Sequence, residues 1–511
     1  MKARSPHARR VAAGALACLT ALALAGCAPV ASDEADGDTV TMMVPYLATS
    51  APSDDNPIHT ALEEVVGAEL DITWVPNSSY GDRTNITLAG DDIPEVMVIQ
   101  GKDPGFVQNA RAGAFWDLTE HLDDYPNLKT TFPEVQQAAS INGRVFGVFR
   151  GRDRMRTAVI LRKDWLKKVG MPLPRTTDDL KAVARAFSES DPDGNGIDDT
   201  YGLIIPKWPG AIGTNSPYDV IETWYGAGNR WTERTGKLVP NFTTDEWLDA
   251  VDYEKSLIDE GLVNPDYATF DSANWNEPFL NGKGGIIVDV HSRAGVIMNL
   301  FKESDPDNFA DYVDITGNLV GPDGELHAHP TTGYYGFLAI PKAAVRTEDD
   351  LRRVLGVLDE LNTPEAGAIL NNGIEGVTYT LEGDRAAPVP DAPQSLTDDV
   401  ASYSQIGMNV SGYRGHPPLL PTQQEQELDD RRRAIEASDL ESAVYDPAAA
   451  FVSETYTAQG AQLDTIISDA RLQYIAGQID RDGLIAAIER WRSSGGDQVI
   501  AEINELAADA R

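Results

Sequence analysis

Short apolar runs alternate with amphipathic segments along the N-terminal part of the chain. Residues 39–45 (TVTMMVP) are mostly β-branched or apolar and predict a strand, and a stretch of helical spacing at 58–66 ends at Gly67. Further strands are predicted at 71–75 and at the end of 88–99. Because strands that alternate with helices usually form parallel sheets, this pattern predicts an α/β fold with mainly parallel sheets.

Capping residues mark the starts of several later helices. Thr176 and Thr347 each precede an acidic residue three positions on and an apolar face at helical spacing. Thr244 and the acidic residues after it predict a helix that runs to Gly261. Beyond residue 420 the pattern is mostly helical, which predicts a helical C-terminal region.

The segment 1–26 has the pattern of a secretory signal peptide. Basic residues precede an apolar run at 11–24, which is too short to span a bilayer because a spanning helix needs about 20 residues. The small residues before Cys27 make the segment resemble a bacterial lipoprotein signal. The resemblance implies cleavage before Cys27, a lipid with palmitate chains on its sulfur, and a protein anchored at the extracellular face of the cell membrane, with 27–38 as a flexible tether. The alternative is an ordinary cleaved signal in which the cysteine is incidental.

The charge of the chain restricts its partners. With 80 acidic and 42 basic residues among 511, the formal net charge is −38. This acidity argues against nucleic acid, whose phosphates require a basic surface, and against contact with anionic lipid other than through the anchor. The cysteines are Cys18, which leaves with the signal, and Cys27, so the mature chain depends on its hydrophobic core rather than on disulfides.

The most specific local motif is DPDGNGIDD at 191–199. Oxygen-bearing side chains stand at its first, third, fifth and ninth positions with glycine at the sixth, which is the spacing of a loop that wraps Ca²⁺. The expected ligands of a structural Ca²⁺ ion are Asp191, Asp193, Asn195, Ile197 through its carbonyl, and Asp199. The twelfth position is Gly202 rather than a bidentate glutamate, which leaves the sixth ligand open. The alternative is a solvated acidic turn.

Aromatic residues gather in predicted loops, and flat apolar rings suit the C–H faces of sugars. Tyr46, Trp208, Tyr218 and Trp224 lie beside Gly- or Pro-rich connections and are the best candidates for a binding cleft. The alternative for each ring is burial in the core, which is commoner for a single aromatic residue.

Four arginines alternate at positions 150, 152, 154 and 156, and on a strand they would share one face. One interpretation is a guanidinium array for the carboxylate or sulfate groups of a ligand. The alternative, which we favour for the set, is a solvated face paired with nearby acids. Arg150, beside Phe149 and Gly151, is the exception that we expect to act in binding.

The sequence contains no motif that indicates an enzyme. HExxH, GxSxG and phosphate-binding glycine patterns are absent, and the seven histidines are scattered. Carboxylate pairs are uninformative among 80 acidic residues. We therefore expect a binding protein.

Several motifs, taken in order, resemble those of extracellular solute-binding lipoproteins of ABC importers, in the group that takes up oligosaccharides. They are LAGDDIPE at 88–95, NGRVFGVFR at 142–150, LRKDWLKKVG at 161–170, YGAGNRW at 225–231, EGLVNPD at 260–266, FLNGKG at 279–284, NGIEGVTY at 372–379 and YIAGQ at 474–478. The loop at 191–199 is similar to the calcium loop of relatives that bind alginate-type oligosaccharides, although those relatives carry glutamate where Thr200 stands.

This resemblance implies a periplasmic-binding-protein-like fold with two α/β lobes, each a mainly parallel sheet flanked by helices. Ligand would bind in the cleft between the lobes and favour hinge closure. By analogy, lobe 1 comprises 39–152 and 290–345, and lobe 2 comprises 153–289 and 346–511.

The resemblance also implies the ligand, the partners and the site. We expect a monomer that captures a carbohydrate and delivers it to ABC permease subunits. The implied ligand-binding residues are Tyr46, Arg150, Trp208, Tyr218, Trp224, His291 and Tyr334. Two other classes stay open: a secreted polysaccharide-active enzyme, and a sensor or adhesion lipoprotein that works without a transporter.

Overall fold

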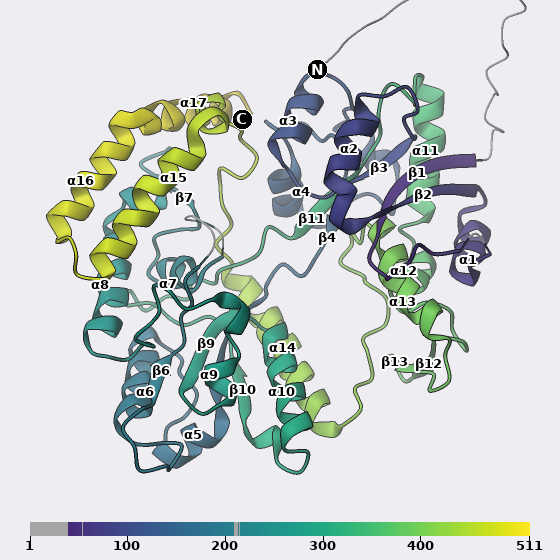
Figure 1. Ribbon diagram of the computed structural model, residues 1–511. Helices are drawn as coiled ribbons and strands as arrows, with labels where there is room; N and C mark the ends of the chain where they lie inside the picture. The colour runs from purple at the N-terminus through teal and green to yellow at the C-terminus, as the bar shows by residue number, and fades with distance from the viewer. Residues whose placement is uncertain (1–38, 54, 209–212, 214, 511) are drawn as a thin grey trace, which may run out of the picture.

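Two lobes lie side by side in the computed structural model (Figure 1). The structure describes residues 39–53, 55–208, 213 and 215–510. The predicted signal peptide, the tether and Cys27 lie outside the described residues. Within the described part of the chain, no helix has both the length and the apolar character needed to cross a bilayer.

The first lobe is built on a sheet with the strand order β2-β1-β3-β11-β4. β1 pairs in parallel with β2 and β3, whereas β11 runs antiparallel to both β3 and β4. The strands are β1 (Thr39–Tyr46), β2 (Glu69–Pro76), β3 (Val96–Ile99), β4 (Val148–Gly151) and β11 (Tyr334–Ala339). The three strands predicted from the N-terminal pattern are therefore confirmed.

The second lobe is built on a sheet with the strand order β10-β5-β9-β6. β5 runs antiparallel to β10 and β9, and β9 is parallel to β6. The strands are β5 (Thr157–Arg162), β6 (Tyr201–Leu203), β9 (Gly284–Val290) and β10 (Val313–Thr316).

Both sheets are mixed, so the α/β class is confirmed but the expectation of mainly parallel sheets is wrong. β4 leads out of the first lobe and β11 follows the return, and the two strands are neighbours in the sheet. A strand that leads out of a lobe and a neighbouring strand that follows the return run in opposite directions, so the two pair antiparallel. A parallel pair would instead need a crossover connection within the same lobe.

Helices and a small two-stranded sheet surround the sheet of the first lobe. The helices are α1 (Pro57–Val66), α2 (Tyr80–Leu88), α3 (Pro104–Arg111), α4 (Pro133–Ala139), α11 (Glu348–Glu360), α12 (Pro364–Asn372) and α13 (Gln394–Tyr403), and the small sheet pairs β12 (Tyr379–Glu382) with β13 (Arg385–Pro388). α1 ends at Gly67, whose φ of 65° is left-handed and suits glycine. α11 begins with the predicted capping box at Thr347.

The second lobe has more helices, including a helical C-terminal region. They are α5 (Lys163–Val169), α6 (Thr177–Glu189), α7 (Pro217–Trp224), α8 (Asp245–Asp259), α9 (Glu277–Leu280), α10 (Ser292–Ser304), α14 (Gln423–Asp439), α15 (Glu454–Ile475), α16 (Arg481–Trp491) and α17 (Asp497–Asp509), with a hairpin of β7 (Trp231–Arg234) and β8 (Lys237–Pro240). The capping side chains of Thr176 and Thr244 begin α6 and α8 as predicted.

The hydrophobic cores define the lobes differently from the boundaries predicted by analogy. Apolar side chains at 351–410 pack with those of β1 and β3 in the first core. Side chains at 294–315 pack with Ile160 and Phe279 of the second lobe. The assignments of 346–410 to lobe 2 and of 290–316 to lobe 1 are therefore wrong. A segment belongs to the sheet against which it packs, and its local apolar pattern does not specify which sheet that is.

Within the described residues, the chain passes between the lobes at 152–156, 317–333 and 407–422, which we call the crossing segments. Backbone hydrogen bonds tie the three together. Arg152 N donates to Gly333 O over 2.9 Å, Thr331 N donates to Arg154 O over 2.7 Å, and Gly151 N donates to Met408 O over 2.6 Å. These bonds place the side chains of the crossing segments at one junction.

Candidate functional site

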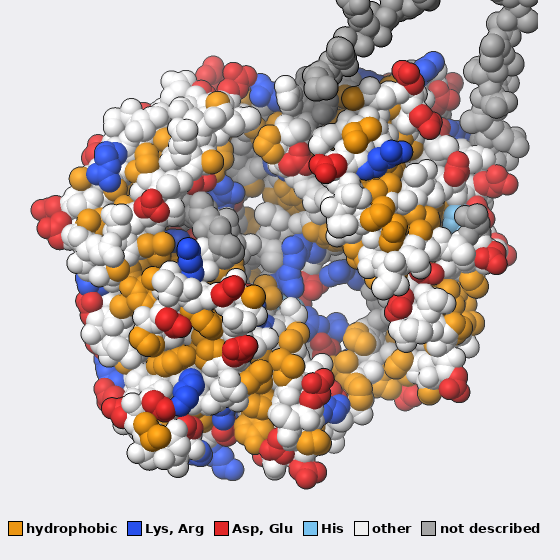
Figure 2. All heavy atoms as spheres, viewed as in Figure 1, with side chains coloured by type: hydrophobic (Ala, Val, Ile, Leu, Met, Phe, Trp, Pro, Cys, Tyr) orange, Lys and Arg blue, Asp and Glu red, His pale blue; other side chains and the backbone are white. Residues whose placement is uncertain are grey.

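A cavity of about 590 Å³ lies where the crossing segments meet α10 and α14. We call it the hinge cavity, and its lining includes Asp153, Arg156, His291, Ser292, Asp429 and Arg432. Figure 2 shows the surface hollowed between the two lobes, with Lys and Arg side chains gathered beside the hollow. Three basic and three acidic side chains line the cavity, so the formal charge of its lining is balanced.

Arg150, predicted as a polar clamp, ends up beneath the surface of this junction. Its side chain is fully buried, its guanidinium lies 4.2 Å from the centre of the Tyr335 ring, and its Nη2 donates to Gln405 Oε1 over 2.7 Å. No hydrogen-bond partner for Arg150 Nε is found among the described residues. Burial lowers the pKa of Arg150 below its usual value. In this conformation Arg150 supports Tyr335 rather than presenting its own surface to a ligand.

The other three alternating arginines lie in the first crossing segment and not on one strand face. Arg154 pairs with Glu134 over 2.8 Å and stacks on Phe132, as the preferred alternative expected. Arg156 Nη2 donates only to Ser292 Oγ, over 3.2 Å. For Arg152 the described residues provide no side-chain hydrogen bond or ion pair, and burial together with the charge of Arg156 lowers the pKa of Arg152. Arg152 and Arg156 are therefore cations without a carboxylate partner in the described part of the chain.

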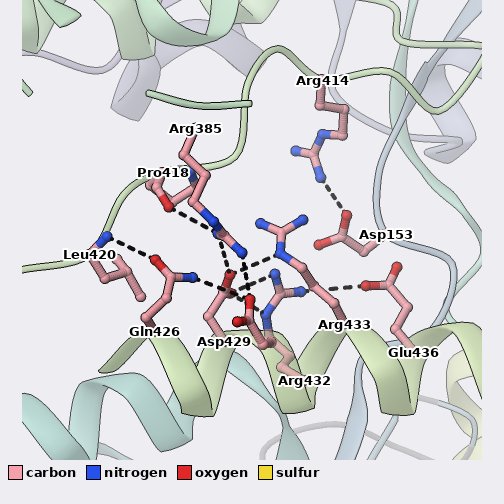
Figure 3. Close-up of polar contacts among 11 residues, drawn as sticks. Asp153, Arg385, Arg414, Pro418, Leu420, Gln426, Asp429, Arg432, Arg433 and Glu436 are labelled. Atoms are coloured by element: carbon pink, nitrogen blue, oxygen red, sulfur yellow. Dashed lines mark hydrogen bonds and ion pairs between the residues drawn. The ribbon is translucent and has the colours of Figure 1, made fainter. Parts of the chain in front are cut away.

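An ion-pair network fixes α14 against the junction (Figure 3). Arg385 of β13 reaches Asp430 over 2.5 Å and so joins the first lobe to α14. Asp429 accepts from both Arg432 and Arg433. Arg414 pairs with Asp153 over 2.8 Å; burial acts to raise the pKa of Asp153, but the Arg414 charge outweighs it and the pKa falls below its usual value.

His291 stands between β9 and α10 and is one of the residues that line the hinge cavity, and it stays a predicted ligand contact. Its side chain is 6 % exposed, and neither ring nitrogen has a hydrogen-bond partner among the described residues. Burial and the nearby Arg432 charge lower its pKa to about 4, so the ring is neutral at neutral pH. A neutral imidazole with unused nitrogens can donate one hydrogen bond and accept another.

The remaining aromatic candidates separate into two groups. Tyr46 at the end of β1, Trp208 after β6 and Tyr334 at the start of β11 are half-buried. The Trp208 ring meets the edge of Trp275, with 5.9 Å between ring centres. The Tyr334 hydroxyl donates to the Ala138 carbonyl over 3.3 Å. These positions, near strand ends, keep the three residues as predicted ligand contacts.

Tyr218 and Trp224, by contrast, lie in the second core, so the prediction that they form sugar platforms is wrong for this conformation. Trp224 is fully buried, and its Nε1 donates to Asn318 Oδ1 over 2.8 Å. Tyr218 is 2 % exposed and lies against the Arg471 guanidinium. Both rings belong to α7, whose residues from Pro217 to Trp224 are all buried. A helix enclosed on every side has no sequence periodicity that would reveal which ring faces a ligand.

Sequence reasoning missed Arg432 and the role of Tyr335. The run of three arginines at 431–433 is a visible signal in an acidic chain. Its meeting with His291, however, depends on the packing of α14 against α10, which are far apart in the sequence.

The acidic loop at 191–199 folds as a tight turn on the second lobe. Gly196 N donates to Asp191 Oδ2 over 2.9 Å, and Asn195 Nδ2 donates to Asp193 Oδ2 over 2.6 Å. Asp199 pairs with Lys283. No cluster of three or more His, Cys, Asp or Glu side chains arranged for a metal is found in the described residues. The loop thus brings the carboxylates of Asp193 and Asp199 to the same side chain, Asn195, while Lys283 forms an ion pair with Asp199.

Comparison with known proteins identifies the family. The model of the bacterial extracellular solute-binding protein family matches residues 48–368. Lipoprotein LipO of Bacillus subtilis (strain 168) is 43% identical over 491 residues, covering 96% of each chain. The polygalacturonan/rhamnogalacturonan-binding protein YtcQ of the same organism is 31% identical over 455 residues, covering 88% of each chain.

A solved structure agrees in fold. An HMO-binding, ABC-transporter-associated solute-binding protein from Bifidobacterium longum infantis matches with a TM-score of 0.68 at 18% identity, over 92% of this chain and 98% of that one. Membership of a family of binding proteins confirms the expectation that the chain is not an enzyme. The two-lobed architecture, the family model and the full-length relatives lead to one conclusion: the chain belongs to the bacterial extracellular solute-binding proteins.

Proposed function

We propose that this protein is the substrate-binding component of an ABC importer and that it captures an oligosaccharide between its lobes. The observation that carries the proposal is similarity over 88% of the chain to YtcQ, which is named for binding polygalacturonan and rhamnogalacturonan, combined with a cavity at the lobe junction that is lined by charged and apolar side chains. The half-buried rings of Tyr46, Trp208 and Tyr334 supply apolar surfaces of the kind that sugars contact.

The crossing segments suit a hinge. The first of them, 152–156, is short, and the backbone hydrogen bonds among the three segments would keep them together while the lobes rotate. A bound sugar that contacts both lobes stabilises the closed form relative to the open form. The size of this effect is the difference between the affinities of the sugar for the closed and the open form. The closed form would then be recognised by permease subunits, with the protein acting as a monomer.

A lipid at Cys27 would keep this receptor beside its permease at the extracellular face of the membrane. The LipO relative is named a lipoprotein, and an anchor raises the effective concentration of a binding protein without new contacts. Cys27→Ala should therefore leave folding and ligand binding unchanged while moving the protein from the membrane fraction into the medium. A Cys18→Ala variant is the matched control, because Cys18 lies inside the expected signal.

The loop at 191–199 is the proposed site of a structural Ca²⁺ ion. The convergence of Asp193, Asn195 and Asp199 supports it, and Ca²⁺ would replace Lys283 as the partner of Asp199. Chelation should then lower the melting temperature, and added Ca²⁺ should restore it. If chelation leaves the melting temperature unchanged and the native protein contains no metal, the loop is a solvated turn and not a Ca²⁺ site.

A melting-temperature screen tests the main proposal. Ligand that binds only the native state raises stability by mass action, by about 2.7 kcal/mol at a hundredfold excess over Kd. We expect oligosaccharides to raise the melting temperature, with peptides as the matched negative set. A shift with peptides alone would contradict the carbohydrate assignment.

A further inference from the structure

A hairpin turn of the first lobe touches the second lobe outside the crossing segments. Asn142 and Gly143 form this turn, and their φ angles of 52° and 79° are both positive, as a tight two-residue hairpin loop requires. Asn142 N donates to Ala450 O over 2.8 Å, and Asn142 Oδ1 accepts from Val452 N over 2.9 Å. One residue therefore makes a reciprocal pair of hydrogen bonds with the segment between α14 and α15.

That segment, 446–453, which we call the strap, is fixed to the second lobe. Ala448 belongs to the second core, and Phe451 packs against the same core. The Ser453 hydroxyl caps the start of α15. Because α14 and α15 are both helices of the second lobe, the bonds from Asn142 join the two lobes at a place where the chain itself does not pass between them.

Charged groups of both lobes meet at the strap. Lys102 of the first lobe donates from its Nζ to Ala449 O over 2.5 Å. Burial raises the pKa of Asp446 to about 6, while the charges of Arg230 in the second lobe and Lys102 in the first lobe oppose that rise. An acidic residue of the strap is therefore attracted by a cation of each lobe.

The contact between the turn and the strap is polar and loosely packed. A cavity of about 460 Å³ lies beside it, and its lining includes Gln137 of α4, Gly143, Ala450 and Phe451. Protein cores are close-packed, so a void of this size between two lobes means that few dispersion contacts hold them together here. Hydrogen bonds rather than close packing hold the turn to the strap, which suits a contact that separates and re-forms.

We propose that the turn at 142–143 and the strap form a latch, which holds the lobes together in the ligand-free protein and separates when the lobes rotate apart. The crossing segments provide the pivot, and the latch determines how much of the ligand-free protein is closed. A receptor whose binding-competent form is only partly populated binds more weakly in proportion to that population, so the latch also sets the affinity. This inference goes beyond the proposed function, because the latch does not depend on the identity of the ligand.

The distance between the lobes in the ligand-free protein tests the latch. Spin labels at Glu360→Cys on α11 and Ala486→Cys on α16, both exposed, would report this distance by pulsed electron paramagnetic resonance in the mature chain with Cys27→Ala. Asn142→Gly keeps the positive φ and removes the side-chain acceptor, so the ratio of separated to joined lobes should rise about two- to tenfold. Lys102→Met should raise the same ratio.

Asn142→Asp is the matched control, because a carboxylate oxygen can accept the same bond from Val452 N and aspartate tolerates a positive φ. Its distance distribution should stay close to that of the wild type. Asn264→Ala is a second control. Asn264 Oδ1 also accepts from a backbone N–H, that of Ile205 over 2.7 Å, but both residues lie in the second lobe. This variant should lower the melting temperature and leave the distance between the lobes unchanged.

A disulfide provides the opposite perturbation. A Cβ atom on Gly143 would lie 3.9 Å from the Cβ atom of Ala510 at the end of α17, which is within the range for a disulfide. The oxidised Gly143→Cys/Ala510→Cys protein should contain joined lobes only, seen as a smaller radius of gyration in small-angle X-ray scattering. Reduction with dithiothreitol should restore the separated population.

Two results would overturn the latch. In the first, Asn142→Gly and Lys102→Met lower the melting temperature without changing the distance distribution, so the contact is structural only. In the second, separated lobes persist in the oxidised disulfide protein, so the lobes do not part at the turn and the strap. None of these measurements uses a sugar, so failure of the proposed function would show separately, as the absence of a melting-temperature shift with oligosaccharides.

Discussion

The ammonium group of Lys102 lies 2.5 Å from the carbonyl oxygen of Ala449 and joins the first lobe to the segment that precedes α15. The same Nζ donates to the carbonyls of Ala138 and Ser140 over 2.9 and 2.8 Å. Burial lowers the pKa of Lys102 from 10.5 to about 8. One cation thus organises three carbonyl groups from two parts of the chain at a site where charge is costly.

Lys102 should make the free energy of unfolding depend on pH in the alkaline range. Between pH 8 and 10.5 the unfolded state binds more protons at this residue than the folded state, so the free energy of unfolding should rise with pH by up to about 3 kcal/mol. Lys102→Met should remove this rise and, by leaving buried carbonyls unpaired, cost about 1–3 kcal/mol. Urea unfolding at a series of pH values measures both effects, and a parallel pH dependence of variant and wild type would contradict the assignment.

Trp224 and Trp208 should respond to substitution in opposite ways. Trp224 is fully buried, so Trp224→Ala should lower the free energy of unfolding by about 3–5 kcal/mol. Trp208 is half-buried, so Trp208→Ala should cost far less stability and should weaken sugar binding. Trp208→Phe is the control that keeps a flat ring. Loss of affinity in a stable, folded Trp224 variant would return Trp224 to the binding site.

Arg471 should be essential to the second core. Its Nη1 lies 2.6 Å from Glu222 and 3.3 Å from Asp219, and all three side chains are buried. Removing one member of a buried ion pair leaves an uncompensated charge, so Arg471→Met should cost about 3–5 kcal/mol. Chemical unfolding measures this loss. Arg490→Gln, an exposed arginine on α16, should be neutral by comparison.

Ionisation of Glu254 should lower the free energy of unfolding as the pH rises. Burial and the neighbouring Glu222 raise its pKa well above 4.5, and neither carboxylate oxygen has a hydrogen-bond partner among the described residues. The unfolded state releases this proton first, so the folded state binds more protons and the free energy of unfolding falls as pH increases above 4.5.

Glu254→Gln tests this dependence, because it keeps the shape and removes the titration. The variant should match the wild type at acidic pH and exceed its stability at neutral pH by about 1 kcal/mol or more. Melting temperatures across the acidic to neutral range provide the measurement. A constant difference between variant and wild type at all pH values would show that Glu254 does not titrate in this window.

The sequence by itself determined the local elements. The capping signals at Thr176, Thr244 and Thr347 begin helices where they were predicted, because a cap is a contact between residues three positions apart. The first strands and the helical C-terminal region followed from apolar spacing for the same reason. The ordered motifs also indicated the correct family, and the expectation for His291 near the cleft remains compatible with its place at the junction.

Only the tertiary structure decided which lobe each segment joins and which rings are enclosed. Residues 351–410 and 294–315 have apolar patterns that fit either core, and their lobes depend on contacts with distant strands. The sequence around Trp224 does not differ from that around Trp208 in a way that indicates burial. Trp224 is buried because the structure encloses α7 on every side. The hinge cavity likewise combines residues separated by more than a hundred positions. Local spacing specifies helices and strands, whereas burial and charge balance arise from long-range packing that a single sequence does not reveal.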